Sequence, residues 1–315
     1  MRVLVTGGAG FIGSNIVKEL NNDESIKSII VLDNLSNGNI KNIVKSDKVF
    51  FKKGDICDFE LVSDICERVD IICHQAAWGS VPRSMEQPKD YMNNNVYGFS
   101  CLVEAAKNSG IKKIIYASSS SVYGDNSDFE KVENNIGKQL SPYALSKRFD
   151  EMLADNFYNL YGINFYGLRY FNVFGENQRS DSEYSAVIPK FIKSLKENKR
   201  PIIFGDGYQS RDFTYVKNVV DMNVNIIKNI NVSGSHFFNV GLGKSTSVNE
   251  LFRLIKEKLD SKITPIYEDK RKGDILNSLA NIDSSRKIGY NPSIDIEEGL
   301  EKTIEWFKQK PYTHL

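Results

Sequence analysis

The chain begins Met1-Arg2-Val3-Leu4-Val5-Thr6-Gly7-Gly8-Ala9-Gly10-Phe11-Ile12-Gly13, an apolar run that breaks into glycines. The run is typical of a buried β-strand, and residues 14–20 continue it as an amphipathic helix. Gly7 permits a tight turn, Gly10 lets backbone N–H groups approach a pyrophosphate, and Gly13 lets the helix pack closely on the strand. The helix N-terminus then faces the phosphates, where its unpaired N–H groups favour an anion. We therefore predict a dinucleotide-binding turn.

The acid that follows the second strand makes this prediction more specific. The spacing Gly-x-x-Gly-x-x-Gly is weak alone, because glycine-rich turns after strands are common. Residues 29–32 are apolar and end in Asp33-Asn34, about twenty residues after the last glycine. An acid here suits the ribose diol and repels a 2′-phosphate, so the expected cofactor is NAD rather than NADP. A third apolar run leads to Gly54-Asp55-Ile56, and Asp55 suits an adenine edge.

Composition and charge are those of a sizeable soluble enzyme. The 315 residues are 41% hydrophobic, enough for a full core and two domains. Since 41 basic and 40 acidic residues nearly cancel, a nucleic-acid partner is not expected. We also expect no membrane span or signal peptide. The four cysteines lack Cys-x-x-Cys spacing and the three histidines lack metal-ligand spacing. These features favour a cytoplasmic protein with reduced thiols and no metal.

The order of apolar segments predicts the fold class. Strands are expected at 2–6, 28–33, 49–53, 70–76, 112–118 and 164–170, with amphipathic segments between them. This alternation predicts an α/β fold with a doubly wound parallel (Rossmann) sheet. Two long helices are expected at 89–108 and 142–160. We expect an NAD-binding domain at 1–171, to which segments near 212–240 return. Residues 172–315 are expected to form a smaller α/β substrate lobe.

A tyrosine and a lysine after the fifth strand are candidate catalytic residues. The strand runs into four serines, Ser118–Ser121, and Tyr143 and Lys147 follow at the start of the second long helix. One helical turn places Tyr143 and Lys147 on the same face. Moving the phenol pKa from near 10 toward 7 requires roughly 4 kcal/mol, which a nearby ammonium and a nicotinamide cation can supply. A serine hydroxyl can relay the proton to and from a substrate alcohol.

Taken together, the motifs closely resemble those of the extended short-chain dehydrogenase/reductase family, specifically its NAD-dependent nucleotide-sugar 4-epimerases. The resemblance covers almost the whole chain. It rests on Thr6-Gly7-Gly8-Ala9-Gly10-Phe11-Ile12-Gly13, Asp33-Asn34, Asp55-Ile56, His74-Gln75-Ala76-Ala77, Asn94-Asn95-Val96, Ser118–Gly124, Tyr143–Lys147, Arg169-Tyr170-Phe171-Asn172-Val173-Phe174-Gly175, Phe204-Gly205-Asp206-Gly207, Arg211-Asp212-Phe213 and Arg271-Lys272-Gly273-Asp274. The combination is highly specific.

The resemblance implies a role for each matching residue. Tyr143 is the general base, Lys147 holds the nicotinamide ribose and tunes Tyr143, and Ser119 bonds the reacting hydroxyl. NAD-binding residues are implied at Gly7, Gly10, Phe11, Ile12, Gly13, Asp33, Asn34, Gly38, Asp55, Ile56, Gln75, Ala76, Ala77, Asn94, Lys147 and Tyr170. UDP-sugar-binding residues are implied at Gly79, Ser80, Arg83, Ser119, Ser120, Ser121, Tyr143, Asn172, Gln178, Val187, Phe204, Arg211, Arg271, Asp274 and Ser278. The two long helices resemble the family's four-helix dimer interface, so a homodimer is expected.

Where this chain departs from the motifs of related enzymes, some of their reactions are disfavoured. Sugar-nucleotide 4,6-dehydratases carry an Asp-Glu pair where this chain has Ser120 and Ser121, and uronate decarboxylases use a Glu in this stretch. The resemblance therefore implies C4 epimerisation of a UDP-sugar through a transient 4-keto sugar. Strict UDP-galactose epimerases have a Lys at Gly79 and a bulky Tyr at Ser278. The small residues favour UDP-GlcNAc and UDP-GalNAc, with Gln178 near the acetamide.

Several alternatives stay open. One is UDP-glucose/UDP-galactose as the substrate pair, and another is a UDP-(N-acetyl)uronate whose carboxylate meets Arg83. A dehydrogenase that releases NADH is disfavoured by Asn172, Arg211 and Arg271. A non-catalytic NAD-binding protein is disfavoured by the intact Ser119, Tyr143 and Lys147.

Overall fold

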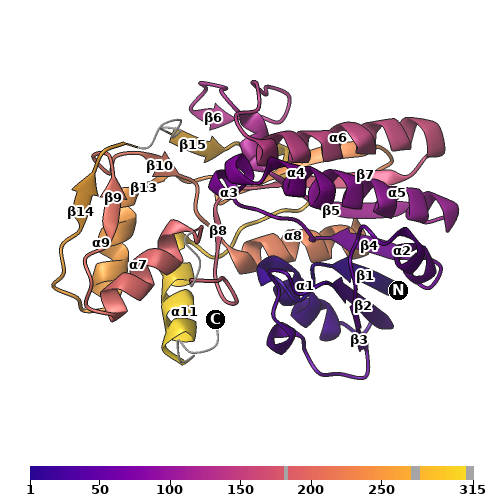
Figure 1. Cartoon of the computed structure of the whole chain (residues 1–315), viewed down its shortest axis with the longest axis horizontal. Helices are drawn as coiled ribbons and strands as arrows, with labels where there is room; N and C mark the ends of the chain where they lie inside the picture. The colour runs from indigo at the N-terminus through magenta and orange to yellow at the C-terminus, as the bar shows by residue number, and fades with distance from the viewer. Residues whose placement is uncertain (181–183, 271–276, 310–315) are drawn as a thin grey trace.

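The centre of the molecule is a seven-stranded sheet in the order β12-β7-β5-β4-β1-β2-β3 (Figure 1). The computed structural model describes residues 1–180, 184–270 and 277–309. The strands are β1 (Arg2–Thr6), β2 (Ser28–Asp33), β3 (Val49–Lys53), β4 (Ile71–His74), β5 (Lys113–Ser119), β7 (Asn164–Tyr170) and β12 (Ser235–Val240). Every neighbouring pair is parallel. The predicted α/β class with a doubly wound parallel sheet is confirmed.

The central strands are mainly apolar because both faces of the sheet are covered. In β1, Val3 and Val5 pack into one hydrophobic cluster and Leu4 into the other, and all three are fully buried. Side chains alternate between the two faces of a strand, so a strand buried on both faces is apolar at most of its positions. The continuous apolar run at the N-terminus therefore specifies a central strand.

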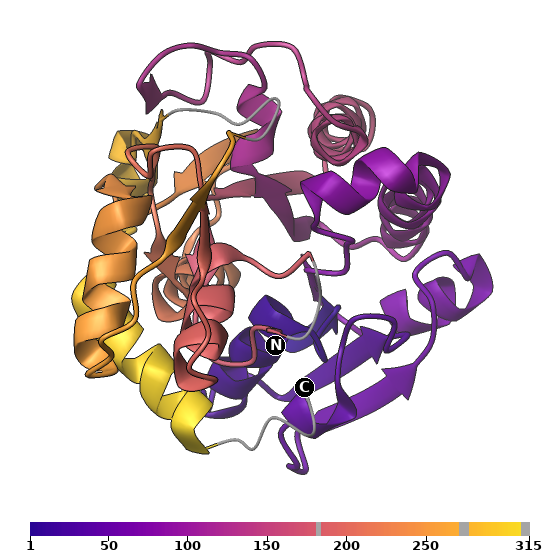
Figure 2. The ribbon, with the colours of Figure 1, turned by 60° about the vertical axis from the view of Figure 1, so that its left-hand side comes forward.

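Helices cover the two faces of the sheet (Figure 2). On one face α1 packs against α8, and on the other α2 packs against α5, with α6 beside α5. The helices are α1 (Phe11–Asn21), α2 (Phe59–Cys66), α3 (Val81–Glu86), α4 (Pro88–Tyr91), α5 (Gly98–Asn108), α6 (Pro142–Tyr161) and α8 (Val216–Asn229). The carboxyl ends of the strands are left open between these layers.

Three expected elements differ in their bounds. The strand expected at 70–76 ends at His74, because the N–H of Ala76 donates to the Thr6 hydroxyl (3.3 Å) as the chain leaves the sheet. The strand expected at 112–118 is shifted by one residue. The helix expected at 89–108 is divided into α4, a π-helical segment at Met92–Tyr97 and α5. The π-helix inserts Asn95 toward Trp78, as described below.

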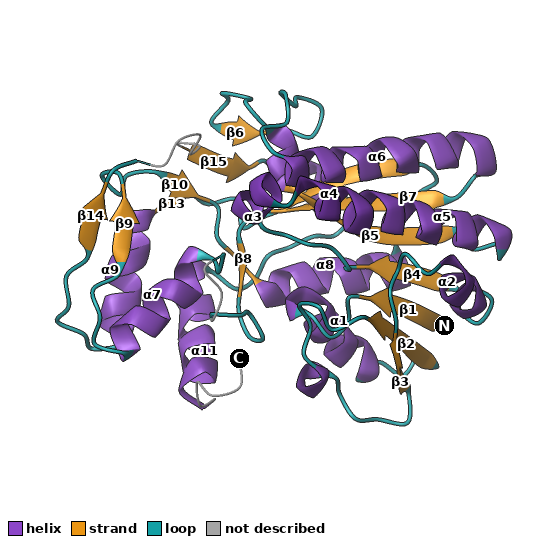
Figure 3. Cartoon of the chain, in the orientation of Figure 1, coloured by secondary structure: helices purple, strands orange, loops and turns teal. Residues whose placement is uncertain are grey.

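The remaining elements form a second, smaller part of the molecule beside the carboxyl edge of the large sheet (Figure 3). A four-stranded sheet has the order β13-β10-β15-β6, and two-stranded sheets pair β11 with β8 and β14 with β9. The strands are β6 (Glu130–Lys131), β8 (Val173–Phe174), β9 (Ile202–Phe204), β10 (Ser210–Arg211), β11 (Thr214–Tyr215), β13 (Thr246–Ser247), β14 (Ile266–Glu268) and β15 (Asn277–Ala280). The helices are α7 (Val187–Lys196), α9 (Val248–Lys258), α10 (Asp283–Lys287) and α11 (Ile296–Gln309), and 3₁₀ turns lie at Ile40–Asn42 and Ser120–Tyr123.

The chain passes between the two parts several times. Helix α8 and strand β12, from the second half, complete the large sheet and its helical layer. Conversely, β6 from the first half pairs with β15 in the four-stranded sheet. These crossings join the wall formed by the large sheet to the wall formed by the smaller sheets, and the cavity described next lies between them.

Candidate active site

A cavity of about 1000 Å³ runs along the carboxyl edge of the large sheet. Its walls come from the ends of β1, β2, β4, β5 and β7 on one side and from β10 and β15 on the other. In parallel α/β sheets, ligands bind at this edge. Most of the predicted site residues line it: Gly7, Gly10, Phe11, Ile12, Gly13, Asp33, Asn34, Gly38, Ile56, Gln75, Ala76, Ala77, Gly79, Ser80, Arg83, Asn94, Ser119, Ser120, Ser121, Tyr143, Lys147, Tyr170, Asn172, Gln178, Arg211 and Ser278.

The glycine turn is as close-packed as the sequence predicts. Gly7 has φ +66°, and a Cβ there would lie 2.6 Å from the Ala76 nitrogen. A Cβ on Gly13 would lie 2.3 Å from the Gly7 oxygen, and one on Gly10 would lie 3.1 Å from it. Helix α1 starts after Gly10 with no side-chain cap on its N–H groups. Free N–H groups at the end of a strand–turn–helix unit fit a pyrophosphate.

The Asp33 carboxylate is fixed in the cavity wall. Oδ2 accepts from the N–H of Ala9 (2.9 Å) and Oδ1 from that of Leu35 (2.8 Å). A Cβ on Gly38 would lie 2.8 Å from Asp33 Oδ1, so the loop passes the acid closely. A held carboxylate at the end of β2 fits a ribose diol.

Three predicted contacts are not part of the cavity wall. Asp55 stands behind it, where its carboxylate accepts from Asn34 Nδ2 (2.8 Å) and from the N–H of Cys57 (2.9 Å). Asp55 therefore orients Asn34, while its neighbour Ile56 borders the cavity. Val187 begins α7 just after Ala186, which does line the cavity, and Phe204 ends β9 away from it. The contacts expected of these three residues stay predictions. Arg271 and Asp274 lie outside the described residues.

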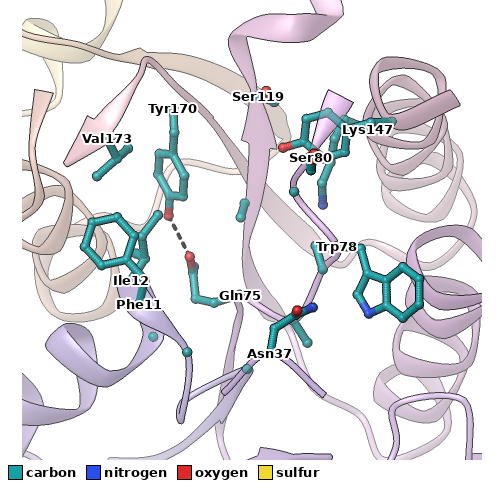
Figure 4. Close-up of a pocket in the computed structure, with 18 of the residues that line it drawn as sticks. Phe11, Ile12, Asn37, Gln75, Trp78, Ser80, Ser119, Lys147, Tyr170 and Val173 are labelled. Atoms are coloured by element: carbon teal, nitrogen blue, oxygen red, sulfur yellow. Dashed lines mark hydrogen bonds between the residues drawn. The ribbon is translucent and has the colours of Figure 1, made fainter. Parts of the chain in front are cut away.

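The catalytic candidates come from two adjoining elements. Ser119 ends β5, and its hydroxyl accepts from the N–H of Ser121 (3.1 Å) as the chain enters a 3₁₀ turn. Ser141 caps α6 by accepting from the N–H of Ala144 (3.1 Å), and Pro142 begins the helix. This start sets Tyr143 in the first turn of α6 and Lys147 one turn later. Figure 4 shows Lys147, Ser80 and Ser119 on one side of the cavity.

Aromatic rings support Tyr143 from the side of α4. The Tyr143 ring meets Tyr91 edge-on at 6.3 Å, and Tyr91 meets Trp78 edge-on at 5.6 Å. The guanidinium of Arg83 lies over the Trp78 ring, 4.1 Å from its centroid. Edge-to-face contacts fix ring orientation. Tyr143 is therefore held between the helix start and this aromatic row.

The π-helix ties Trp78 to α6. The side chain of Asn95 accepts from the N–H of Trp78 (2.9 Å), and its Nδ2 donates to the Trp78 carbonyl (3.2 Å) and to the Ser146 hydroxyl (3.0 Å). π-Helical turns often occur at functional sites. Here the extra residue of the turn lets a buried amide join the loop after β4 to the helix that carries Lys147.

A second hydrogen-bond network holds Gln75 on the opposite side of the cavity. The Tyr170 hydroxyl donates to Gln75 Oε1 (3.0 Å), as the dashed line in Figure 4 marks, and Asn223 Nδ2 donates to the Tyr170 oxygen (2.9 Å). Gln75 Nε2 donates in turn to Asn223 Oδ1 (3.2 Å). Burial holds the pKa of Tyr170 well above its usual range, so its phenol stays neutral. Tyr170 thus orients Gln75 beside Phe11 and Ile12.

On the far wall, Arg211 and Ser278 are opposite each other in paired strands β10 and β15. The buried carboxylate of Asp212 anchors this sheet, since it accepts from the N–H groups of Leu242 (2.7 Å), Gly243 (2.9 Å) and Ala280 (3.3 Å). Burial raises the pKa of Asp212 to about 6 against these hydrogen bonds. Asn172 Nδ2 donates to the Asp212 carbonyl (3.1 Å).

Asn172 and Gln178 extend this wall toward the large sheet. Asn172 has φ +32°, a conformation that L-residues avoid and that clusters at ligand sites. Gln178 Nε2 donates to the Val173 carbonyl (3.0 Å), which fixes its amide.

Several lining residues were absent from the sequence prediction: Asn37, Trp78, Tyr91, Lys131, Asn177, Arg179 and Tyr184. Trp78 follows the strand that ends at His74, so the rule that sites lie at strand carboxyl ends would have found it. Tyr91 and Lys131 come from elements whose position depends on tertiary packing. Among the described residues, no group of three His, Cys, Asp or Glu side chains could hold a metal ion, and no helix is long and apolar enough to cross a membrane.

Comparison with known proteins identifies the family. Residues 3–241 match the model of the NAD dependent epimerase/dehydratase family. The chain belongs to this family. This chain is 40% identical over 313 residues to the putative UDP-glucose 4-epimerase of Methanocaldococcus jannaschii. The match covers 99% of this chain and 100% of the relative. The resemblance inferred from the motifs is confirmed, and the protein uses NAD.

Solved structures of similar proteins agree with the fold of this family member. The UDP-N-acetylglucosamine 4-epimerase of Methanobrevibacter ruminantium, in complex with UDP-N-acetylmuramic acid, has a TM-score of 0.93 and 41% identity over 98% of both chains. The UDP-glucose 4-epimerase of Thermus thermophilus, in complex with NAD, has a TM-score of 0.87 and 30% identity over 98% of this chain and 99% of that one.

Proposed function

We propose that this enzyme interconverts UDP-GlcNAc and UDP-GalNAc. The chain is an NAD-dependent nucleotide-sugar 4-epimerase, and therefore an isomerase, that acts on UDP-sugars. The choice of N-acetylated sugars rests chiefly on Ser278, a small residue in the cavity wall where a bulky side chain would close the sugar pocket.

The residues on the large-sheet side carry the reaction. Tyr143 takes the proton of the C4 hydroxyl as the sugar is oxidised to the 4-keto form, and Ser119 bonds the reacting oxygen. The keto sugar then turns over in the cavity, and Tyr143 returns the proton to the C4 oxygen as the other face of the sugar is reduced. The Lys147 ammonium holds the nicotinamide ribose and favours the phenolate form of Tyr143. NAD, when bound, supplies the hydride acceptor and donor. Because the cofactor is regenerated in each turnover, the enzyme gains from retaining it.

The two walls divide the remaining binding roles. The turn at Gly7, Gly10 and Gly13 and the acid Asp33 hold NAD, whereas Asn172 and Arg211 hold the UDP diphosphate and ribose. Arginine suits this task because its planar donors match phosphate oxygens. We assign the binding of NAD to a domain of residues 1–171 together with α8 and β12. We assign the binding of UDP to the rest of residues 172–315.

Two features of the cavity leave room for an acetamide. Ser278 is a small side chain in the cavity wall, and an added Cβ at Gly79 would meet no atom within 4 Å. Near Asn172, the Oε1 of Gln178 is buried and has no hydrogen-bond partner among the described residues. An acetamide N–H is a donor that matches such an acceptor after a small rotation of the side chain. The similarity to a UDP-N-acetylglucosamine 4-epimerase supports the same choice.

Exchange of Ser278 for tyrosine tests the substrate assignment. In Ser278→Tyr, kcat/KM for UDP-GlcNAc should fall roughly 10- to 100-fold more than kcat/KM for UDP-glucose, because overpacking excludes the larger sugar. Ser278→Ala, which adds no bulk, should preserve the preference. Bound NAD, measured after denaturation, controls for folding. An equal loss on both sugars, or a native enzyme indifferent to the acetamide, would remove Ser278 as the determinant.

Arg83 supports a second substrate class, the UDP-(N-acetyl)uronates. Its guanidinium lies over Trp78 in the cavity wall and donates through Nε to Gln87 Oε1 (3.1 Å). A carboxylate on the sugar would match the remaining donors of this fork. Faster turnover of a UDP-uronate than of UDP-GlcNAc would favour this class, and faster turnover of UDP-glucose would favour the non-acetylated pair.

We also propose that the enzyme is a cytoplasmic homodimer that supplies sugars for polysaccharide synthesis. The expected interface is formed by residues 89–108 and 142–160. On α6, Leu145, Phe149 and Met152 are exposed at positions i, i+4 and i+7, so they form one apolar stripe. Such a stripe on a long helix is typical of a protein interface.

A further inference from the structure

A buried carboxylate lies one helical turn beyond Lys147. Lys147 Nζ is 3.1 Å from Asp150 Oδ2, and the two side chains are 2% and 0% exposed. The other oxygen, Oδ1, is buried without a hydrogen-bond partner in the described part of the chain. A buried carboxylate without a cation beside it is costly, so Asp150 depends on Lys147.

The next acid on α6 is balanced independently. Glu151 accepts from Arg169 through both of its oxygens (2.8 and 2.9 Å) and from the Ser118 hydroxyl (2.7 Å). Arg148 also pairs with it at 3.1 Å. Adjacent carboxylates therefore have different partners. Glu151 belongs to a network that joins α6 to β5 and β7, whereas Asp150 is paired with the lysine at the cavity.

We propose that Asp150 is a positioning residue that holds the Lys147 ammonium and balances its charge, and thereby sets the ionisation of the Tyr143 phenol. This inference rests on the roles of Tyr143 and Lys147 given under the proposed function.

Among the titratable groups around the Lys147–Asp150 pair, Asp150 is the one whose charge changes near pH 7. The other groups are Tyr143 on α6, Tyr91 on α4 with Arg83 on α3 beside it, His74 on β4, Tyr116 on β5, and Arg169 with its partner Glu151. Burial lowers the pKa of His74 to about 3, so that ring is neutral near pH 7. Burial also raises the pKa of Tyr116 well above its usual range. Burial raises the pKa of Asp150 to about 7, although Lys147 opposes the shift.

The sign of the effect on Tyr143 follows from the charges. With Asp150 ionised, the lysine and the acid form a neutral pair, and the positive field at the phenol is weakened. Loss of the negative charge leaves Lys147 unbalanced and frees its ammonium from Asp150. Both changes favour the phenolate, so the pKa of Tyr143 must fall.

Asp150→Asn tests this directly, because it removes the charge and keeps the shape. Phenolate absorbance of the NAD-bound enzyme is followed against pH, and the same titration with Tyr143→Phe in each background is subtracted to isolate Tyr143. We expect the pKa of Tyr143 to fall by about one unit. The acid limb of the kcat/KM profile should move to lower pH in parallel.

The matched control is Asp155→Asn, which removes an acid from the same helix without touching the pair, and it should leave the pKa of Tyr143 in place. Should Asp150→Asn fail to fold, Asp150→Ser removes the same charge and should lower the pKa in the same way. An unchanged or raised pKa of Tyr143, or an equal fall in the Asp155 variant, would overturn the proposal. Full activity in Tyr143→Phe would instead overturn the proposed function, and the Tyr143 titration would still report on Asp150.

Discussion

At the scale of single residues, chemistry depends on groups that the backbone holds in place before any ligand binds. Tyr143 is fixed by the capped start of α6 and by the ring of Tyr91, so little rearrangement is needed for proton transfer. Tyr143→Phe removes one oxygen from this arrangement. We expect epimerisation to fall by at least 10²–10⁴-fold, the range that proton transfer by a positioned side chain contributes.

Thermal unfolding and the amount of bound NAD should be unchanged in Tyr143→Phe, since the ring and its contacts remain. Turnover near the native rate in that variant would exclude Tyr143 as the base.

The sequence predicted residues that act through local geometry better than those that depend on distant elements. Gly7, Gly13 and Asp33 lie in one strand–turn–helix unit, where spacing along the chain determines position in space. Asp55 is separated from the cavity by Asn34, whose amide donates to its carboxylate, and this contact between two strand ends is not visible in the sequence. Trp78 could have been predicted, because it follows the carboxyl end of β4.

At the scale of elements, the π-helix at Met92–Tyr97 is the feature that periodicity could not reveal. Its apolar positions have helical spacing, which predicts one continuous helix, and the extra residue of the π-helical turn is apparent only from the backbone. The two-residue strands of the smaller sheets were equally invisible, because two residues carry no alternation. The long central strands were predictable because burial on both faces gives each of them an apolar run.

Asn95→Ala should therefore lower the free energy of unfolding, because it removes the hydrogen bonds that the π-helix makes to Trp78. The substitution leaves the part-buried N–H of Trp78 without its partner, which costs roughly 1 kcal/mol of unfolding free energy. Urea denaturation of the NAD-bound protein measures the loss. The matched control is Asn93→Ala, on the exposed side of the same π-helix, and it should cost far less. Equal losses in the two variants would show that the Trp78 contacts of Asn95 add little.

At the scale of the whole molecule, a cavity between two walls explains why the second half of the chain is needed. The large sheet carries the glycine turn and the proposed catalytic residues at its carboxyl edge, whereas Arg211 and Ser278 lie on short strands of the smaller sheet. Segments near 212–240 were expected to return to the first part of the molecule, and β12 lies in that range and pairs with β7. The pairing of β6 with β15 was not predictable, since strand pairing across such distances leaves no local pattern.

The apolar stripe on α6 gives a prediction about assembly. Light scattering should give twice the chain mass of 35.7 kDa for the native protein. Met152→Lys places a charge in the stripe at a side chain that is 56% exposed, and it should yield the monomer. Tyr208→Lys, at an exposed ring on the smaller part of the molecule, should stay dimeric. A monomeric native protein would contradict the proposed interface.

We propose that the enzyme inverts C4 of UDP-GlcNAc with NAD that it already carries. The most direct measurement is proton NMR of UDP-GlcNAc mixed with purified enzyme and no added cofactor, with NADH absorbance recorded in the same sample. We predict that UDP-GalNAc appears until the two sugars reach a constant ratio, while NADH does not accumulate with product. No UDP-GalNAc after the addition of NAD, or NADH formed in proportion to sugar consumed, would contradict the account.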